Sequence, residues 1–155
     1  MKKKLIVRLA STPEEATAAC AVLRENVKMV GFVTRGAVLK KMEQGELVVA
    51  KSTDDDSIVG CICFHVRRDR IAVIYEIAVL KYAAGSGVGS AMITWLSKAL
   101  TKRAVAIKLK CTVDNVDANK FYQKIGFAYC GEERGRKRSL SIWRMELGGG
   151  FGFTR

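Results

Sequence analysis

Ala84-Gly85-Ser86-Gly87-Val88-Gly89 places three glycines at alternate positions in this 155-residue chain. The stretch lies between an apolar run, Tyr75 to Val79, with the pattern of a strand and a run, Ser90 to Leu100, with the pattern of a helix. Glycine lets backbone N–H groups turn toward a ligand, and the start of the following helix adds partial positive charge. The stretch therefore predicts a cradle for a phosphate or pyrophosphate, with a plain strand-to-helix connection as the simpler alternative.

The spacing of these glycines separates the loop from two common phosphate-binding motifs. No Gly-Lys-Ser or Gly-Lys-Thr follows, so the loop does not match a P-loop. It also fits a dinucleotide-binding fingerprint poorly, because the glycines fall at other positions and no ribose-binding acid stands on a second strand about 20 residues later. The loop alone leaves the identity of the phosphate ligand open.

A second motif lies downstream of the glycine loop. Residues 117–125 have the pattern of a short helix that ends before Gly126, with an apolar face made of Ala118, Phe121, Tyr122 and Ile125. The composite Asn115-x-x-Ala118-x-x-x-Tyr122-x-x-x-Gly126-Phe127 resembles the second signature of the Gcn5-related N-acetyltransferases, the GNAT family. In that light, Val79 to Ser90 resembles their acetyl-CoA pyrophosphate loop.

The resemblance runs from about Ile6 to Leu147 and implies the fold. It implies an α/β fold whose central sheet is mixed and mostly antiparallel, flanked by about four helices and splayed between two strands at the acetyl-CoA site. The length, with 49% hydrophobic and 27% charged residues, agrees with one small core. We expect residues 1–147 to form a single acetyltransferase domain and residues 148–155 to form a flexible C-terminal tail.

Hydrophobic periodicity and turn residues predict the individual elements. The first helix follows Thr12-Pro13-Glu14-Glu15, which has the pattern of a capping box with proline at the first helical position. Its apolar stripe runs from Ala16 to Val27. The other predicted helices span 36–44, 90–100 and 117–125, and the predicted strands span 5–9, 47–51, 58–67, 71–79, 104–113, 127–132 and 140–147.

The resemblance implies acetyl-CoA as the cosubstrate and CoA as a product. It assigns the cofactor contacts to one strand, the glycine loop and the second motif, namely to Ile77, Ala78, Val79, Ala84, Gly85, Ser86, Gly87, Val88, Gly89, Ser90, Asn115 and Tyr122. Backbone N–H groups of the strand are expected to polarise the thioester carbonyl. Ala84 departs from the family pattern, which usually has Arg or Gln there, so one side chain that organises the pyrophosphate is missing.

Tyr122 stands where the family usually places its general acid. A phenol with a reference pKa of about 10 can protonate a thiolate whose conjugate acid has a pKa near 8.5. The alternative is that Tyr122 only packs its helix against the sheet. Asn115 is expected to hydrogen-bond the pantetheine arm, to cap the helix through its side chain, or to do both.

Glu76 is the one acid inside the apolar run from Ile71 to Val79. Burial would raise its pKa toward neutrality and make it a competent base for the acceptor amine, directly or through water. The equally open alternative is a glutamate on the polar side of the strand. A chain of waters is another route for the proton.

Cys61, Cys63 and His65 alternate along one predicted strand and therefore face the same side. Residues two apart on a strand are separated by about 6.6 to 6.8 Å, and a zinc site needs four converging ligands, so we expect no metal site here. The pattern favours a strand that buries its cysteines. His65 remains a minor candidate for acceptor binding.

The net charge of +12 and the pI of about 9.7 bear on the acceptor. Basic residues cluster at 67–70 and at 134–138, and the implied fold places Arg35 and the second cluster around the acceptor site. We therefore expect Arg35, Arg134, Arg136 and Arg138 to contact the acceptor and to favour an anionic one. The alternative is a solvated basic surface that only attracts CoA.

Three hypotheses of function follow. The main one is an acetyl-CoA-dependent N-acetyltransferase that acts by direct attack of an amine in a ternary complex; the acceptor, whether small molecule, protein or nucleic acid, is open. A basic nucleic-acid-binding module and a catalytically inactive CoA-binding sensor are the alternatives. No stretch approaches the roughly 18 apolar residues of a membrane span, and five scattered cysteines suit reduced thiols, so we expect a cytoplasmic protein without membrane contact, compatible with a homodimer.

Overall fold

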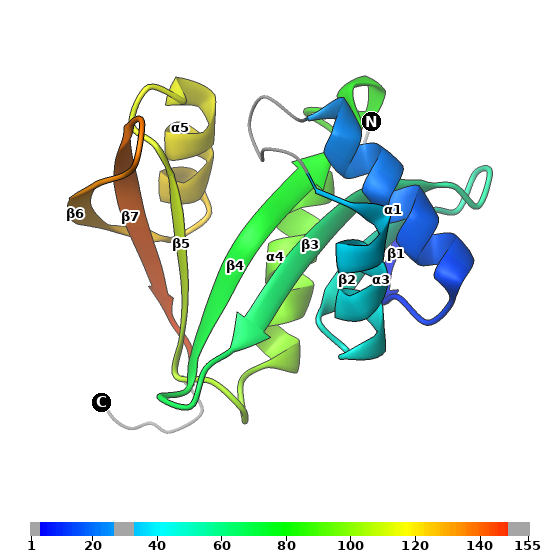
Figure 1. Ribbon diagram of the computed structural model, residues 1–155, viewed down its shortest axis with the longest axis horizontal. Coiled ribbons are helices and arrows are strands. Elements are labelled where there is room, and N and C mark those ends of the chain that lie inside the picture. Colours follow the sequence, from blue (N-terminus) through cyan, green and yellow to red (C-terminus); the bar gives the residue numbers. More distant parts are fainter. Residues whose placement is uncertain (1–3, 27–32, 149–155) are drawn as a thin grey trace. The chain divides into compact units, whose positions relative to one another are not determined.

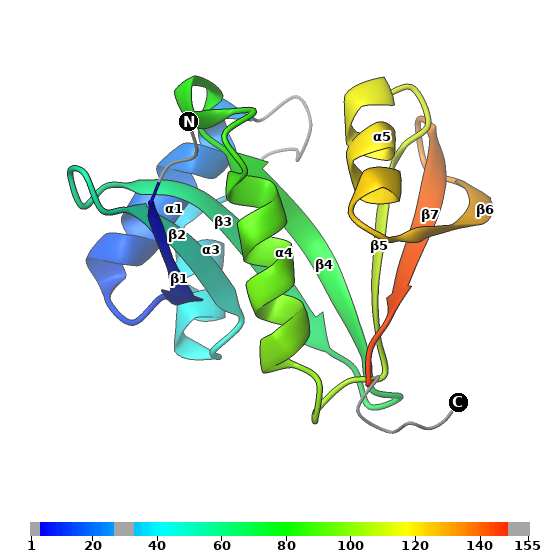
Figure 2. The same cartoon turned by 180° about the vertical axis from the view of Figure 1, so that it is seen from behind.

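The computed structural model describes residues 4–26 and 33–148 and contains a seven-stranded mixed sheet with helices (Figures 1 and 2). The elements follow in the order β1 (Leu5–Leu9), α1 (Pro13–Glu25), α3 (Arg35–Glu43), β2 (Leu47–Ser52), β3 (Ile58–Val66), β4 (Ile71–Val79), the 3-10 turn η1 (Lys81–Ala83), α4 (Val88–Ala99), β5 (Ala106–Thr112), α5 (Val116–Lys124), β6 (Ala128–Arg134) and β7 (Ser139–Glu146). The strand order is β1-β2-β3-β4-β5-β7-β6. β4 and β5 are parallel, whereas β1 with β2, β2 with β3, β5 with β7 and β6 with β7 are antiparallel. This is the mixed α/β fold that the sequence implies.

The chain divides into two compact units, with β4 contributing to both. The first unit comprises Met1–His65 and Tyr75–Lys98, and the second comprises Val66–Ile74 and Ala99–Arg155. In the second unit, the first half of β4 pairs with β5 from Ile71↔Ala106 to Ile74↔Leu109. Among the described residues, no helix is both long enough and apolar enough to cross a membrane.

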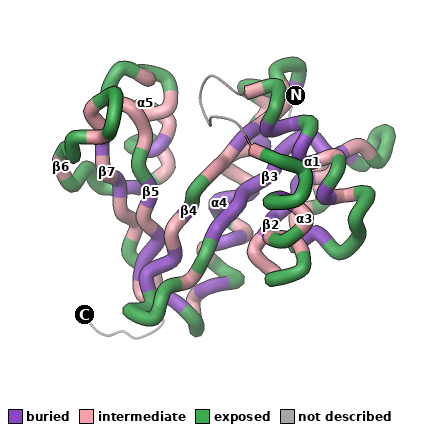
Figure 3. Tube along the Cα trace, viewed as in Figure 1, coloured by how far each residue is buried: buried purple, intermediate pink, exposed green. Residues whose placement is uncertain are grey.

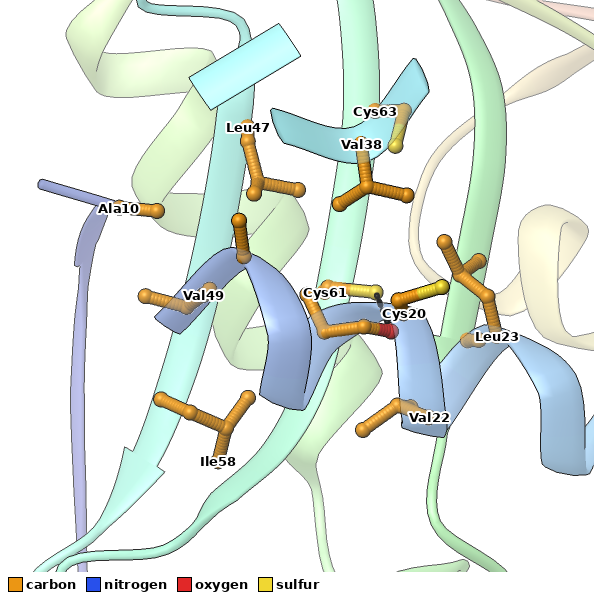
Figure 4. Close-up of a cluster of buried hydrophobic side chains, with 13 residues drawn as sticks. Ala10, Cys20, Val22, Leu23, Val38, Leu47, Val49, Ile58, Cys61 and Cys63 are labelled. Atoms are coloured by element: carbon orange, nitrogen blue, oxygen red, sulfur yellow. Dashed lines mark hydrogen bonds between the residues drawn. The ribbon is translucent and has the colours of Figure 1, made fainter. Parts of the chain in front are cut away.

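In the first unit, helices cover both faces of β3, which is buried from Ile58 to Phe64 (Figure 3). On one face, α1 and α3 pack on β2 and β3 through a cluster that includes Cys20, Leu23, Val38, Leu47, Val49, Cys61 and Cys63 (Figure 4). On the other face, α4 approaches so closely that a Cβ at Gly60 would lie 2.8 Å from Val88 Cγ1. A strand buried on both faces explains the continuous apolar run in its sequence.

The predicted cap is present at the start of α1, but one of its hydrogen bonds has a different donor from that of a capping box. Thr12 Oγ1 accepts a hydrogen bond from the Glu15 amide at 3.2 Å, and Pro13 occupies the first helical turn. The Glu15 carboxylate accepts from the Ser11 amide at 2.9 Å, whereas a capping box would use the Thr12 amide. Glu15 also forms an ion pair with Arg8 of β1, so the cap ties α1 to the edge strand.

In the second unit, α5 is fastened to β5 and β7 by the side chain of Asn119. Its Nδ2 donates to the carbonyl of Thr112 at 3.1 Å, and its Oδ1 accepts from the Trp143 indole N–H at 2.9 Å. The Cys111 thiol donates to the same Oδ1 at 3.4 Å. β6 is exposed along most of its length and pairs only with β7.

Most bounds agree with the predicted ones to within two residues, and two of the differences bear on the predicted site. α4 begins at Val88 instead of Ser90, because Gly87, with a φ of 90°, completes the turn two residues earlier. β6 extends to Arg134, which pairs with Ser139, so Arg134 ends a strand and is not part of the loop. The predicted helical position Val27 and residues 149–155 of the predicted tail lie outside the described residues.

Glu15 predicts an acid-sensitive contribution to stability. Its hydrogen bond with Arg8 lowers the pKa of the carboxyl from 4.5 to about 2, against the opposing effect of burial. A depressed pKa stabilises the fold above pH 4.5, and this stabilisation is lost as the pH falls from 4.5 to 2. Because the Arg8 side chain is 36% exposed, we expect Glu15→Gln to cost about 1 to 3 kcal/mol at pH 7.

Urea unfolding at pH 7 and at pH 3 measures this contribution. The wild type should lose more stability than Glu15→Gln between the two pH values, while Glu14→Gln, a change at the exposed neighbouring position, should behave as the wild type does. Equal losses in the wild type and Glu15→Gln would contradict the assignment.

Candidate functional site

Two glycines of the loop adopt left-handed backbone conformations. Gly85 and Gly87 have φ values of 79° and 90°, a region that side chains disfavour. A Cβ at either position would meet no described atom within 4 Å, so conformation and not crowding requires glycine here. The space beside both glycines is therefore open.

The start of α4 supplies the donors of this cradle. The Ala91 amide donates to the Gly87 carbonyl at 3.0 Å, which begins the hydrogen-bond ladder of the helix. The N–H groups of Val88, Gly89 and Ser90 precede that bond and have no acceptor within the helix. In the loop itself, the Ala84 and Ser86 amides donate to the carbonyls of Lys81 and Ala83. The first turn of α4 thus fits an anion such as a pyrophosphate.

The strand before the loop is anchored to the end of α1. Asn26 Nδ2 donates to the Val79 carbonyl at 3.3 Å, and the Lys81 amide donates to Glu25 Oε1 at 2.5 Å. The Leu80 amide donates to the Val59 carbonyl at 2.8 Å, which ties the same segment to β3. These bonds hold in place the end of β4, at Ile77–Val79, and the segment that leads into the glycine loop.

Glu76 is half-buried in β4 and faces a thiol. The buried Cys63 side chain donates a hydrogen bond to the Glu76 carboxylate, and the Lys41 ammonium acts on it electrostatically. Burial raises the pKa of Glu76, and these two contacts reduce but do not cancel the rise. Burial and the charge of Glu76 together raise the pKa of Cys63 to about 12, so it remains a thiol donor.

A pocket of about 640 Å³ opens beside Glu76; we call it the Tyr75 pocket. It is lined by Lys41, Gln44, Glu46, His65, Tyr75 and Glu76, from α3, the turn after it, β3 and β4. All of these residues belong to the first unit. His65, a minor candidate from the sequence, lies in the pocket wall, whereas Cys61 and Cys63 are buried in the core. Sequence reasoning missed Lys41, Gln44, Glu46 and Tyr75.

Glu46 organises the charged wall of the Tyr75 pocket. Its carboxylate accepts a hydrogen bond from Lys41 Nζ at 3.0 Å and lies 2.6 Å from His65 Nδ1. Burial would raise the pKa of Glu46, but the hydrogen bonds with His65 and Lys41 lower it overall. Glu46 is therefore an ionised carboxylate that holds two basic side chains in the wall.

Tyr122 and Asn115 lie in the second unit. Asn115 Oδ1 accepts from the Ala118 amide at 3.2 Å, so its side chain caps α5, as one of the two interpretations predicts. Tyr122 is only 6% exposed, and its ring packs edge-on against Phe121 and Phe127 and beside Trp143. Burial, with a smaller effect of Cys111, raises the pKa of Tyr122, so the phenol keeps its proton.

The predicted acceptor-binding arginines are distributed over both units. In the first unit, Arg35 Nε donates to Thr17 Oγ1 at 2.9 Å and so joins α3 to α1. In the second unit, Arg136 is exposed in the turn between β6 and β7, which the Gly135 amide closes onto the Arg138 carbonyl at 2.9 Å. Arg138 lies 4.0 Å from Asp114.

Solved structures of other proteins share the fold of this chain. Ard1 from Thermoplasma volcanium is similar in structure, with a TM-score of 0.80 and 18% identity over 92% of this chain and 97% of that one. The ribosomal-protein-S18-alanine N-acetyltransferase from Escherichia coli gives 0.78 and 17% identity over 98% and 99%. YncA from Salmonella typhimurium, solved with its cofactor acetyl-CoA, gives 0.76 and 14% over 93% and 94%.

Comparison with curated proteins finds no significant match to the chain. The family model of the acetyltransferase (GNAT) family matches residues 8–127, which include the glycine loop, Glu76 and the whole second motif from Asn115 to Phe127. Members of this family use acetyl-CoA as their cosubstrate. The chain therefore belongs to the acetyltransferase (GNAT) family.

Proposed function

We propose that the protein is an acetyl-CoA-dependent N-acetyltransferase in which an acceptor amine attacks the acetyl group directly in a ternary complex. The observation that carries the proposal is the open cradle in front of α4, where Gly85 and Gly87 hold left-handed conformations. The proposal takes residues 1–147 as one acetyltransferase domain, because the family match spans residues of both compact units. The free cysteines agree with a cytoplasmic setting.

Acetyl-CoA supplies an activated acetyl thioester when it is bound. The residues that fit its pyrophosphate are Gly85 and Gly87 to Ser90, through backbone N–H groups of the loop and of the first turn of α4, whereas the Ser86 amide donates to the Ala83 carbonyl. Ala84 offers no side-chain polar group, so backbone donors supply the recognition. We propose that the backbone of Ile77, Ala78 and Val79 holds the carbonyl of the acetyl group.

Glu76 is proposed as the general base. It is half-buried, its pKa is raised by burial, and it lines the Tyr75 pocket, which is large enough for part of an acceptor. A carboxylate with a raised pKa removes a proton from an ammonium group more readily than an exposed one. The proton moves from the acceptor nitrogen to a Glu76 carboxylate oxygen.

Tyr122 is proposed as the general acid, with a proton held at Oη. Its burial fits this role and also fits packing of α5, since the ring is enclosed by aromatic side chains. The exposed basic residues Arg136, Lys137 and Arg138 support an anionic acceptor, which remains part of the proposal. A nucleic-acid-binding module and an inactive CoA sensor are the competing functions.

Release of CoA thiol with a panel of amines, peptides and nucleic acids tests the proposal. Turnover with an amine supports the enzyme. Binding of acetyl-CoA without turnover on any amine would identify the sensor, and nucleic-acid binding without acetyl-CoA binding would identify the nucleic-acid module.

The glycine loop predicts a charge-sensitive cofactor site. Acetyl-CoA at about 100 times its Kd should stabilise the wild type by about 2.7 kcal/mol, visible as a raised Tm. Gly87→Glu should abolish this shift, because it adds a negative charge and a side chain at a φ of 90°. Gly45→Glu is the matched control, since Gly45 has a φ of 72° and equally open surroundings. An undiminished shift in Gly87→Glu would remove the loop from the site.

Tyr122→Phe separates the acid from the packing role. The ring is kept and only the hydroxyl is lost, so turnover should fall about 10²-fold with little change in acetyl-CoA affinity. Steady-state kinetics with wild type and variant measure the effect. Tyr129→Phe is the control, because Tyr129 also packs on Trp143 and is exposed. Wild-type turnover in Tyr122→Phe would make this residue purely structural.

The Cys63 thiol predicts shifts of opposite sign at Glu76. Cys63→Ala removes a donor to the carboxylate and should raise the pKa of Glu76, whereas Cys63→Ser offers a stronger donor and should lower it, each by roughly one unit or less. Carbon-13 NMR titration of the glutamate carboxyls measures this without turnover. Cys61→Ala, which loses a thiol bonded to the Ala19 carbonyl, is the control. Shifts of the same sign in both Cys63 variants would contradict the contact.

A further inference from the structure

The Tyr75 pocket carries more negative than positive charge in its wall. Of its described lining residues, Glu46 and Glu76 supply two carboxyl groups, and Lys41 supplies one ammonium group. His65 is bound to Glu46, and Gln44 is uncharged. The Cys63 thiol behind Glu76 stays protonated, so it adds no charge of its own. The pocket is therefore suited to one further cation.

The pocket already contains an alkylammonium group, that of Lys41. Its Nζ donates to Glu46 Oε1 at 3.0 Å and to the Phe64 carbonyl at 3.3 Å, and it lies 5.2 Å from the centre of the Tyr75 ring. A carboxylate, a carbonyl and an aromatic face are the groups that bind an ammonium ion best. Lys41 thus marks a place where an ammonium group at the end of a flexible chain is bound.

Lys41 is not buried in this position. Its side chain is 25% exposed, and it reaches the pocket from the last turn of α3 through a flexible stem. Tyr75 is 53% exposed, so the ring is accessible to a ligand as well as to Lys41. An incoming ammonium group can therefore compete with Lys41 for the same ring and the same carboxylate.

We propose that the Tyr75 pocket binds the alkylammonium end of the acetyl acceptor. In the absence of an acceptor, the Lys41 ammonium group occupies the same position, and the acceptor displaces it. The proposal rests on the proposed function and names its substrate class, a primary amine on a flexible aliphatic chain. Glu76 follows Tyr75 directly in β4 and lines the same pocket, so the bound ammonium group of the acceptor lies beside the proposed base. The rival interpretation is that Lys41 and His65 bind an anionic group of the ligand.

The two interpretations predict different effects of Lys41→Gln on the affinity for an alkylammonium ion. If the Lys41 ammonium group occupies the position that the acceptor needs, its removal vacates that position, and the Kd for an alkylammonium ion should fall roughly three- to tenfold. If Lys41 is a binding residue for an anion, its removal leaves the affinity for the cation without such a gain. Tyr75→Leu should weaken alkylammonium binding by roughly two- to fivefold, through loss of the cation–π contact.

The experiment uses the full chain without acetyl-CoA and n-butylammonium as the probe. Amide chemical shifts of Tyr75 and Glu76 are followed by NMR at neutral pH, with n-butanol as the neutral probe of the same shape. Lys40→Gln is the matched control, because Lys40 is the exposed neighbour of Lys41 in α3. Lys41→Met repeats the test with a second side chain of similar length, and unchanged Tm values establish that the variants are folded.

Tighter butylammonium binding in both Lys41 variants, unchanged binding in Lys40→Gln and weaker binding in Tyr75→Leu support the proposal. Weaker or equal binding in the Lys41 variants overturns it, as does equal binding of n-butanol. This outcome is independent of turnover. If the pocket binds butylammonium as expected but the protein acetylates no amine, only the proposed function is refuted. If the protein acetylates an amine but the pocket does not bind butylammonium in this way, only the proposal about the pocket is refuted.

Discussion

The close contact between Gly60 of β3 and α4 sets the geometry of the loop in the first unit. A Cβ at Gly60 would lie 2.8 Å from Val88 Cγ1 and 3.0 Å from Met92 Cε. Val88 is the first residue of α4, so the contact fixes the helix end whose N–H groups face the glycine loop. A larger side chain at position 60 would require Val88 or Met92 to shift. The packing of the first turn of α4 therefore depends on a glycine outside the loop itself.

Burial raises the pKa of both groups that are proposed to move protons. It raises the pKa of Glu76, which makes the carboxylate a stronger base, and it raises the pKa of Tyr122, which keeps the phenol protonated. A thiol is a weak hydrogen-bond donor, so Cys63 supports the Glu76 carboxylate without restoring the pKa of an exposed acid. One physical effect thus prepares both a base and an acid.

The sequence predicts most of the fold because hydrophobic period and turn residues are local signals. The Thr12 cap, the buried cysteines of β3 and the capping role of Asn115 were all open to such reasoning. The start of α4 was placed two residues late, because glycine at positions 87 and 89 hides where the turn ends. The Tyr75 pocket escaped prediction because its residues come from separate elements and share no spacing.

Glu46 supplies the carboxyl group that gives the pocket wall its excess of negative charge. Its carboxylate lies 2.6 Å from His65 Nδ1 and 3.0 Å from Lys41 Nζ, and so holds both basic groups against one acid. A single exchange of Glu46 for glutamine would remove that acid and leave Lys41 and His65 facing Glu76 alone. The wall would then hold one carboxyl group, that of Glu76, and one ammonium group, that of Lys41, so its excess of negative charge would be lost. If the acceptor binds in this pocket as proposed, one substitution at position 46 therefore changes which charge the site favours, without any change in the glycine loop or in the core.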